Sequence, residues 1–174
     1  MIEIRAMTGA ELEDFDAHFA RHRAESGRGD IHFMPFAPDD EEGPKGLNVD
    51  ALSYPLVQPG WHRWWLAWDD NRVVGHVDLK GGGIKSVLHR CELGIGIERA
   101  FRGRGLGRQL MQAAIDFAAD SAELDWVDLR VFAHNTNARA LYRSLGFVEQ
   151  ATYADWIRIN DESIDDVTMA LDLR

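Results

Sequence analysis

Residues 92–108 read Glu-Leu-Gly-Ile-Gly-Ile-Glu-Arg-Ala-Phe-Arg-Gly-Arg-Gly-Leu-Gly-Arg, a strand-like run followed by a turn rich in glycine and arginine. Apolar residues then recur at helical spacing from Leu106 to Ala118, so the turn lies between a strand and a helix. Its alternate glycines allow the backbone to approach a ligand closely, and the first turn of a helix leaves N–H groups free. Because four arginines fall within residues 99–108, the turn predicts an anion site, with a diphosphate as the expected ligand.

The spacing of this turn argues against two common phosphate-binding loops. A Walker A loop ends in Gly-Lys-Ser/Thr, whereas Arg108 and Gln109 follow Gly107 here. The dinucleotide-binding fingerprint is Gly-x-Gly-x-x-Gly on an opening strand, whereas this turn has Gly-x-Gly-x-Gly and lies past the middle of the chain. The remaining alternative is a helix start that binds no ligand.

The rest of the chain alternates between strand and helix patterns. Thr8 and Glu11 form a capping box before an apolar helical stripe that ends at Gly27-Arg28-Gly29. Residues 61–68 fit either a tryptophan-bearing helix or a strand, and the following Asp69-Asp70-Asn71 turn favours a hairpin. Further strands are expected at 1–6, 73–79, 91–97, 126–132, 153–159 and 167–173, and further helices at 106–118 and 138–145.

Length and charge fit a single globular domain. The chain of 174 residues carries 19 Lys and Arg against 29 Asp and Glu, a formal charge of −10, which argues against nucleic-acid and anionic-membrane partners. The single Cys91 excludes an internal disulfide and fits a reducing compartment. Without a long apolar run or a signal-peptide pattern, we expect a soluble cytoplasmic protein. We therefore expect one α/β domain over residues 1–174, in which residues 30–60 form a long loop holding all five prolines.

Two separated motifs connect this pattern to a known family. The first is Glu92-Leu93-Gly94-Ile95-Gly96-Ile97 followed by Arg102-x-x-Gly105-x-Gly107, and the second is Asn135-x-x-Ala138-x-x-Leu141-Tyr142-x-x-x-Gly146-Phe147. In this order and at this distance they resemble the GNAT family of N-acetyltransferases over residues 60–173. The resemblance implies the GNAT acyl-CoA acyltransferase fold, a twisted mixed sheet of about six or seven strands with helices on both faces. Residues 30–60 would then be a variable loop on the acceptor side.

The resemblance also implies the chemistry. Members of this family bind acetyl-CoA as a co-substrate, without a metal, in a V-shaped opening between two central parallel strands, here those ending near Ile97 and Phe132. A neutral primary amine, on a small molecule or a peptide, attacks the thioester directly in a ternary complex. Paired sheets make dimers common among relatives, so a homodimer is also expected. The residues implied in cofactor binding are Ile95, Gly96, Ile97, Arg102, Gly103, Arg104, Gly105, Leu106, Gly107, Arg108, Asn135 and Tyr142.

Each part of the cofactor has an expected partner under this resemblance. The diphosphate would lie on the backbone N–H groups of residues 102–108, and Asn135 would contact the cofactor through its side chain. The pantetheine arm would pair like an extra strand with the main chain of residues 95–97. Gly94 and Gly96 suit a β-bulge at that point.

Amine attack needs a proton acceptor and a proton donor. Tyr142 matches the family tyrosine beside the sulfur, where its hydroxyl can protonate the leaving thiolate; the alternative is a helix-face aromatic that packs against Phe147. Glu92 is the candidate base, because many relatives place there a carboxylate that relays the amine proton through water; the alternative is a strand-face ion pair. Asp78 is the second candidate. Arg130 occupies the position where other relatives carry a base on the later strand, which puts that variant mechanism in doubt.

The other chemistry-bearing residues receive structural interpretations. His18 and His22 share a helix face but have no third ligand at a suitable spacing, so we interpret them as a solvated or partly packed face. Cys91 is expected to be a small buried residue rather than an acetyl carrier. The acidic run at residues 39–42 is either a solvated loop or a surface that attracts a cationic amine. The alternative to an enzyme is a non-catalytic acyl-CoA sensor, which would keep the glycine-rich turn and lose the chemistry.

Overall fold

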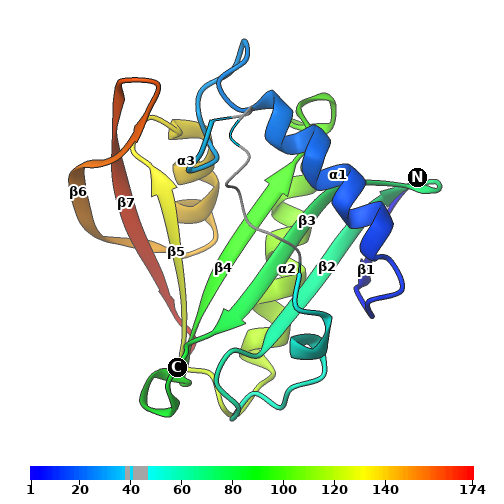
Figure 1. Cartoon of the computed structure of the whole chain (residues 1–174). Helices are drawn as coiled ribbons and strands as arrows, with labels where there is room; N and C mark the ends of the chain where they lie inside the picture. The colour runs from blue at the N-terminus through cyan, green and yellow to red at the C-terminus, as the bar shows by residue number, and fades with distance from the viewer. Residues whose placement is uncertain (38–39, 41–46) are drawn as a thin grey trace.

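The computed structural model describes residues 1–37, 40 and 47–174, and within them one mixed seven-stranded sheet runs in the order β1-β2-β3-β4-β5-β7-β6 (Figure 1). The strands are β1 (Ile2–Ala6), β2 (His62–Asp69), β3 (Arg72–Gly81), β4 (Arg90–Ile97), β5 (Trp126–Phe132), β6 (Val148–Ile159) and β7 (Glu162–Asp172). The helices are α1 (Leu12–Glu25), α2 (Leu106–Ala119) and α3 (Thr136–Ser144). Neighbouring strands are antiparallel except β4 and β5, which are parallel. The predicted mixed sheet is confirmed.

Helices cover both faces of the sheet, as predicted (Figure 1). α1 crosses one face, where Phe15 packs edge-on against Trp64 of β2 with the ring centroids 4.7 Å apart. α2 and α3 lie on the opposite face. Because side chains alternate along a strand, His76 of β3 points toward α1, whereas its neighbour Val77 packs in the core beneath α2. We refer to these two sides as the α1 face and the α2 face.

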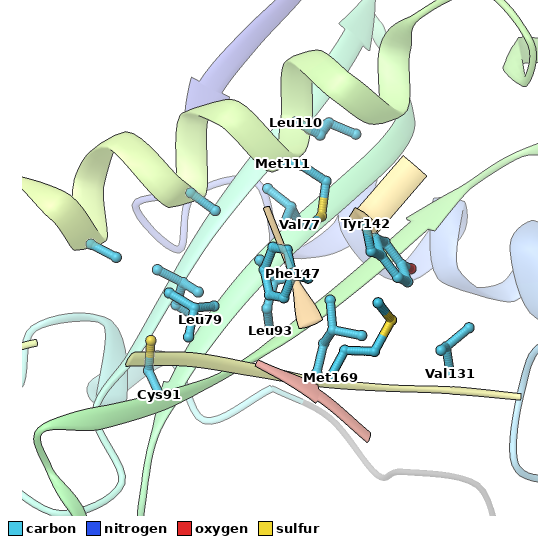
Figure 2. Close-up of a cluster of buried hydrophobic side chains, with 14 of the residues drawn as sticks. Val77, Leu79, Cys91, Leu93, Leu110, Met111, Val131, Tyr142, Phe147 and Met169 are labelled. Atoms are coloured by element: carbon cyan, nitrogen blue, oxygen red, sulfur yellow. The ribbon is translucent and has the colours of Figure 1, made fainter. Parts of the chain in front are cut away.

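The main hydrophobic core lies between the α2 face of the sheet and the two helices on it (Figure 2). Leu110 and Met111 of α2 are fully buried there, and α3 contributes Tyr142 to the same cluster. Fully burying a side chain of this size contributes about 1.5–3 kcal/mol, so the helical stripe expected at residues 106–118 is the main anchor of α2. The core therefore fixes α3, and with it Tyr142, against the central strands.

The tryptophan-rich segment is a strand, as the turn after it indicated. β2 pairs with β1 on one side and β3 on the other, so its three tryptophans pack on the two faces of the sheet, and Trp61 directly precedes the strand. Trp61, Trp64 and Trp68 are buried. In the described part of residues 30–60, Val49–Leu52 forms one 3₁₀ turn. Among the described residues, no helix is long and apolar enough to cross a membrane.

Candidate active site

The central strands β4 and β5 separate partway along their length. Their parallel pairing runs from Arg90 opposite Trp126 to Leu93 opposite Leu129 and then stops. β4 stays paired with β3 as far as Ile97, and β5 stays paired with β7 to its end. A V-shaped opening therefore forms between the strands that end at Ile97 and Phe132, as predicted. One side of the β4 backbone is left without a strand partner over residues 94–97.

A cleft of about 1030 Å³ occupies this opening. Of the predicted site residues, those that line it are Glu92, Ile95, Gly96, Ile97, Arg102, Gly103, Gly105, Gly107, Arg108, Asn135 and Tyr142. Small-molecule sites usually measure about 300–1,000 Å³, so this cleft has room for a large ligand together with a small second one.

The glycine-rich turn leaves the start of α2 open. Gly103 and Gly105 have positive φ values of 72° and 82°, a region that glycine adopts without strain. Gly105 is the residue before α2, and no side chain caps this helix end. The N–H groups of the first turn are therefore free to bind an anion, and the helix dipole favours one there.

Two of the four arginines of this turn bind acidic residues and backbone carbonyls of the protein itself. Arg102 donates from Nε to the carbonyl of Ile97 (2.8 Å) and forms ion pairs with Asp30 and Glu25. Arg99 pairs with Asp30 at 3.4 Å and donates to the carbonyl of Glu25 at 3.2 Å. These contacts fasten the segment after α1 to the glycine-rich turn. Half of the positive charge expected from the sequence is thus paired with acidic residues about seventy positions earlier.

The other two arginines differ in where their side chains lie. Arg108 lines the cleft and donates to the Ser144 hydroxyl at 2.6 Å. Arg104 instead lines a separate small hollow near the N-terminus, and Leu106 is buried in the core. Arg104 and Leu106 can therefore contact a ligand in the cleft through their backbone N–H groups.

The expected β-bulge at Gly94 and Gly96 is wrong. β4 keeps an unbroken register with β3 through both residues. Glycine is required at these two positions for another reason, because neighbouring side chains occupy the space that a Cβ would need. A Cβ at Gly94 would lie 2.5 Å from Oδ1 of Asp78. At Gly96 it would lie 2.5 Å from Cε1 of His76 and 2.6 Å from Nε2 of His22.

The second motif surrounds the opening from the α2 face. Asn135 caps α3, accepting a hydrogen bond from the Ala138 N–H at 3.2 Å. Tyr142 is 7% exposed, and its ring lies within the buried cluster of Figure 2, with Phe147 at a centroid distance of 6.2 Å. Burial raises the pKa of Tyr142 to about 12, so the hydroxyl stays protonated and can donate a hydrogen bond into the cleft.

Two carboxylates reach the α1 face beside the opening. Glu92 is exposed and lines the cleft, one position before the last paired residue of β4. Asp78 lies over Gly94 and is hydrogen-bonded through Oδ2 to Nε2 of His62 at 2.8 Å. Both predicted base candidates thus lie on one side of the lip of the opening.

The opposite lip of the opening carries a polar group that was not predicted as part of the site. Arg130 of β5 binds Asp166 of β7 through Nε (2.8 Å) and Nη2 (2.7 Å), and its guanidinium lies 4.6 Å from the ring centre of Trp156. All three line the cleft, together with Phe33. The pairing of β5 with β7 could not be read from spacing alone, so Asp166 and Trp156 gave no signal.

A buried histidine cluster lies under the cleft, which corrects the solvated alternative for His18 and His22. His18 Nδ1 bonds Glu98 at 3.0 Å and its Nε2 bonds Nδ1 of His76 at 2.9 Å. Arg21 and Arg72 also pair with Glu98. Burial lowers the pKa of His18, of His76 and, to about 3, of His22. Within the described residues, no group of three or more His, Cys, Asp and Glu could hold a metal ion.

Two further expectations concern Cys91 and the acidic run, and the structure decides the first of them. Cys91 is buried, and burial raises the pKa of its thiol to about 12, which confirms a packing residue rather than an acetyl carrier. The acidic run at residues 39–42 lies outside the described residues except for Asp40, so its two interpretations stay open.

Comparisons with known proteins agree with this geometry. A family model described as the acetyltransferase (GNAT) family matches residues 31–147. The uncharacterized N-acetyltransferase YycN of Bacillus subtilis is 29% identical over 149 residues, which cover 85% of this chain and 93% of that protein. L-amino acid N-acetyltransferase AaaT of Escherichia coli is 28% identical over 101 residues, 58% of this chain and 62% of that protein. In fold, the chain is similar to the structure of YncA from Salmonella typhimurium with its cofactor acetyl-CoA (TM-score 0.78, 16% identity, 100% and 95% coverage).

Proposed function

Because this chain belongs to the acetyltransferase (GNAT) family, we propose that it moves the acetyl group of acetyl-CoA to a primary amine by direct attack in a ternary complex. The observation that carries the proposal is the opening between β4 and β5, which lies next to the uncapped start of α2. An extended amide-containing chain with a diphosphate at one end needs these two features side by side. The acetyl-CoA thioester supplies the activated acyl group.

The residues around the cleft fit this co-substrate. The first-turn N–H groups of α2, with the backbone from Arg102 to Arg108, would hold the diphosphate. The unpaired main chain of residues 95–97 would bond the pantetheine amides as a neighbouring strand does. Because Asn135 already uses its side-chain oxygen to cap α3, its amide N–H groups are what it can offer to the cofactor.

The proton steps belong to residues on opposite faces of the sheet. On the α2 face, the protonated hydroxyl of Tyr142 would donate to the leaving thiolate. On the α1 face, Glu92 would accept the amine proton through water, with Asp78 as the second candidate. A reacting centre within the opening lies between these two sides, so donor and acceptor need not compete for one position.

Two measurements test this function. Calorimetry with acetyl-CoA, CoA and ATP should detect binding of both CoA forms and none of ATP, since the turn lacks the Lys and hydroxyl of a nucleotide loop. Thiol release from acetyl-CoA, measured over a panel of primary amines and confirmed by mass spectrometry of the product, should identify an acetylated amine. Strong ATP binding without CoA binding, or CoA binding with no amine acetylated, would refute the proposal.

A further inference from the structure

The lip of the V-shaped opening has opposite charges on its two sides. Arg130 is the first residue of β5 beyond the paired segment, and Gly94 is the first on β4. Because facing residues of neighbouring strands point to the same side, Glu92, Gly94 and Arg130 all project from the α1 face. Asp78 lies over Gly94 on the β4 side. Carboxylates therefore line one side of the lip, and a guanidinium lines the other.

Arg130 is held by one edge and open at the other. Asp166, 2% exposed, accepts from Nε and pairs with Nη2, which fixes the plane of the guanidinium. Among the described residues, none accepts a hydrogen bond from Nη1, and the side chain remains 38% exposed. A guanidinium fixed in this way keeps N–H donors in place for an incoming anion.

The edge strand is shaped to complete this subsite. The register of β6 on β7 shifts between Tyr153 and Ile157, and Asp155 in this bulge has a φ of +50°. The bulge is fixed by the Asp155 N–H, which donates to Asp165 Oδ1 at 2.8 Å. The bulged segment carries Trp156, whose ring packs on Arg130. Bulges commonly redirect a side chain beside an active site, and this one places an aromatic ring over the guanidinium.

The strand register allows side chains from both sides of the lip to reach one small zwitterion. Arg130 lies two residues beyond Asp128, which faces Glu92, so the two side chains start about 7 Å apart along the strand direction. Long side chains from these positions can approach the same small ligand. An ammonium beside the carboxylates and a carboxylate beside the guanidinium would each meet an opposite charge.

We propose that the acceptor is a free α-amino acid whose carboxylate binds the open edge of Arg130 and whose amine faces Glu92 and Asp78. This inference rests on the proposed function. A polyamine would place a second positive charge against Arg130, and a peptide N-terminus has no carboxylate on the reacting residue. The guanidinium of Arg130, which lines the cleft with one edge open, therefore favours the amino acid over both.

The test compares free amino acids with amines that lack the free carboxylate. Initial rates of thiol release should be measured for the common L-amino acids, for the amides of the best ones, for a short peptide and for putrescine. The free amino acid should exceed its own amide in kcat/KM by about tenfold or more, the size of one charge-assisted hydrogen bond. An amide, peptide or diamine that equals or exceeds it overturns this inference and leaves the acetyltransferase function intact. No acetylation of any amine removes both.

Variants locate the effect. Arg130→Gln should raise KM for the amino acid about tenfold or more, leave the amide little changed and leave acetyl-CoA affinity intact; Arg130→Lys should restore part of the preference. Arg90→Gln is the matched control, because Arg90 also pairs with an aspartate (Asp128) and packs over a tryptophan (Trp126), yet it does not line the cleft. Thermal unfolding of each variant should be measured to verify that it still folds. Equal losses toward amino acid and amide in Arg130→Gln, or the same loss in Arg90→Gln, would assign Arg130 a structural role.

Discussion

The side chain of Tyr142 has a buried ring and a hydroxyl that stays protonated at physiological pH. With its pKa raised to about 12, it is available as a donor throughout the working range of the enzyme. Tyr142→Phe should therefore lower kcat about tenfold or more while the Kd for acetyl-CoA stays nearly unchanged, because the ring keeps its packing. Single-turnover rates and calorimetry measure the two quantities. Unchanged turnover would remove Tyr142 from the mechanism.

The two carboxylates can be separated by their response to pH. If Glu92 accepts the amine proton, Glu92→Gln should lower kcat about a hundredfold near neutral pH, with activity recovering as the amine deprotonates at higher pH. Asp78→Asn should have a smaller effect, because Asp78 is already hydrogen-bonded to His62. Full pH–rate profiles of both variants are the measurement. The larger loss in Asp78→Asn would reverse the assignment.

At the residue scale, the sequence identified residues that a local motif brings together. The glycines of the turn were predicted from their own pattern and Tyr142 from the family resemblance, and the structure brings them to one cleft. Prediction failed where partners come from distant segments. His18 is buried because it meets Glu98, eighty positions later, and Arg102 is neutralised by Asp30. No local pattern encodes either contact.

The glycines of β4 make room for side chains of neighbouring elements, and the strand keeps an unbroken register with β3. Gly96→Ala would push a Cβ into the rings of His22 and His76, so it should lower the free energy of unfolding by about 1–3 kcal/mol. Gly83→Ala is the control, since no atom lies within 4 Å of its Cβ position and its stability should change little. Urea unfolding compares the two. Equal stabilities would mean that the histidine rings shift without cost.

At the scale of elements, the type of each helix or strand was predicted better than its first and last residues. The hairpin of β2 and β3 was predicted from the turn that joins them, and the parallel pair of β4 and β5 was implied by the family resemblance. β6 begins at Val148 rather than at 153, and β7 at Glu162 rather than at 167. β6 is an exposed edge strand with a bulge, so neither burial nor strict alternation marks its start.

The molecule as a whole should be sensitive to mild acid. His18, His22 and His76 have lowered pKa values in the folded state, so the unfolded chain binds more protons below its ordinary histidine pKa of about 6.5. Stability is therefore fully present above that pH and falls as pH drops toward the folded value, about 3 for His22. For each histidine, the free energy of unfolding falls by about 1.4 kcal/mol per pH unit between the unfolded and the folded pKa. Urea unfolding from pH 8 to pH 5 measures it; a flat profile contradicts the neutral cluster.

The sheet consists of two halves that are joined by the short parallel pairing of β4 with β5. Four residue pairs join β4 to β5, whereas seven join β4 to β3 and seven join β5 to β7. One half carries Glu92 and Asp78, and the other carries Arg130 and Trp156. A CoA molecule bound in the opening would contact both halves and so would hold the proposed acceptor subsite at one width. We expect ordered addition, in which calorimetry detects the acceptor in the presence of CoA and not without it; equal affinity in both conditions would indicate that the subsite has this width without CoA.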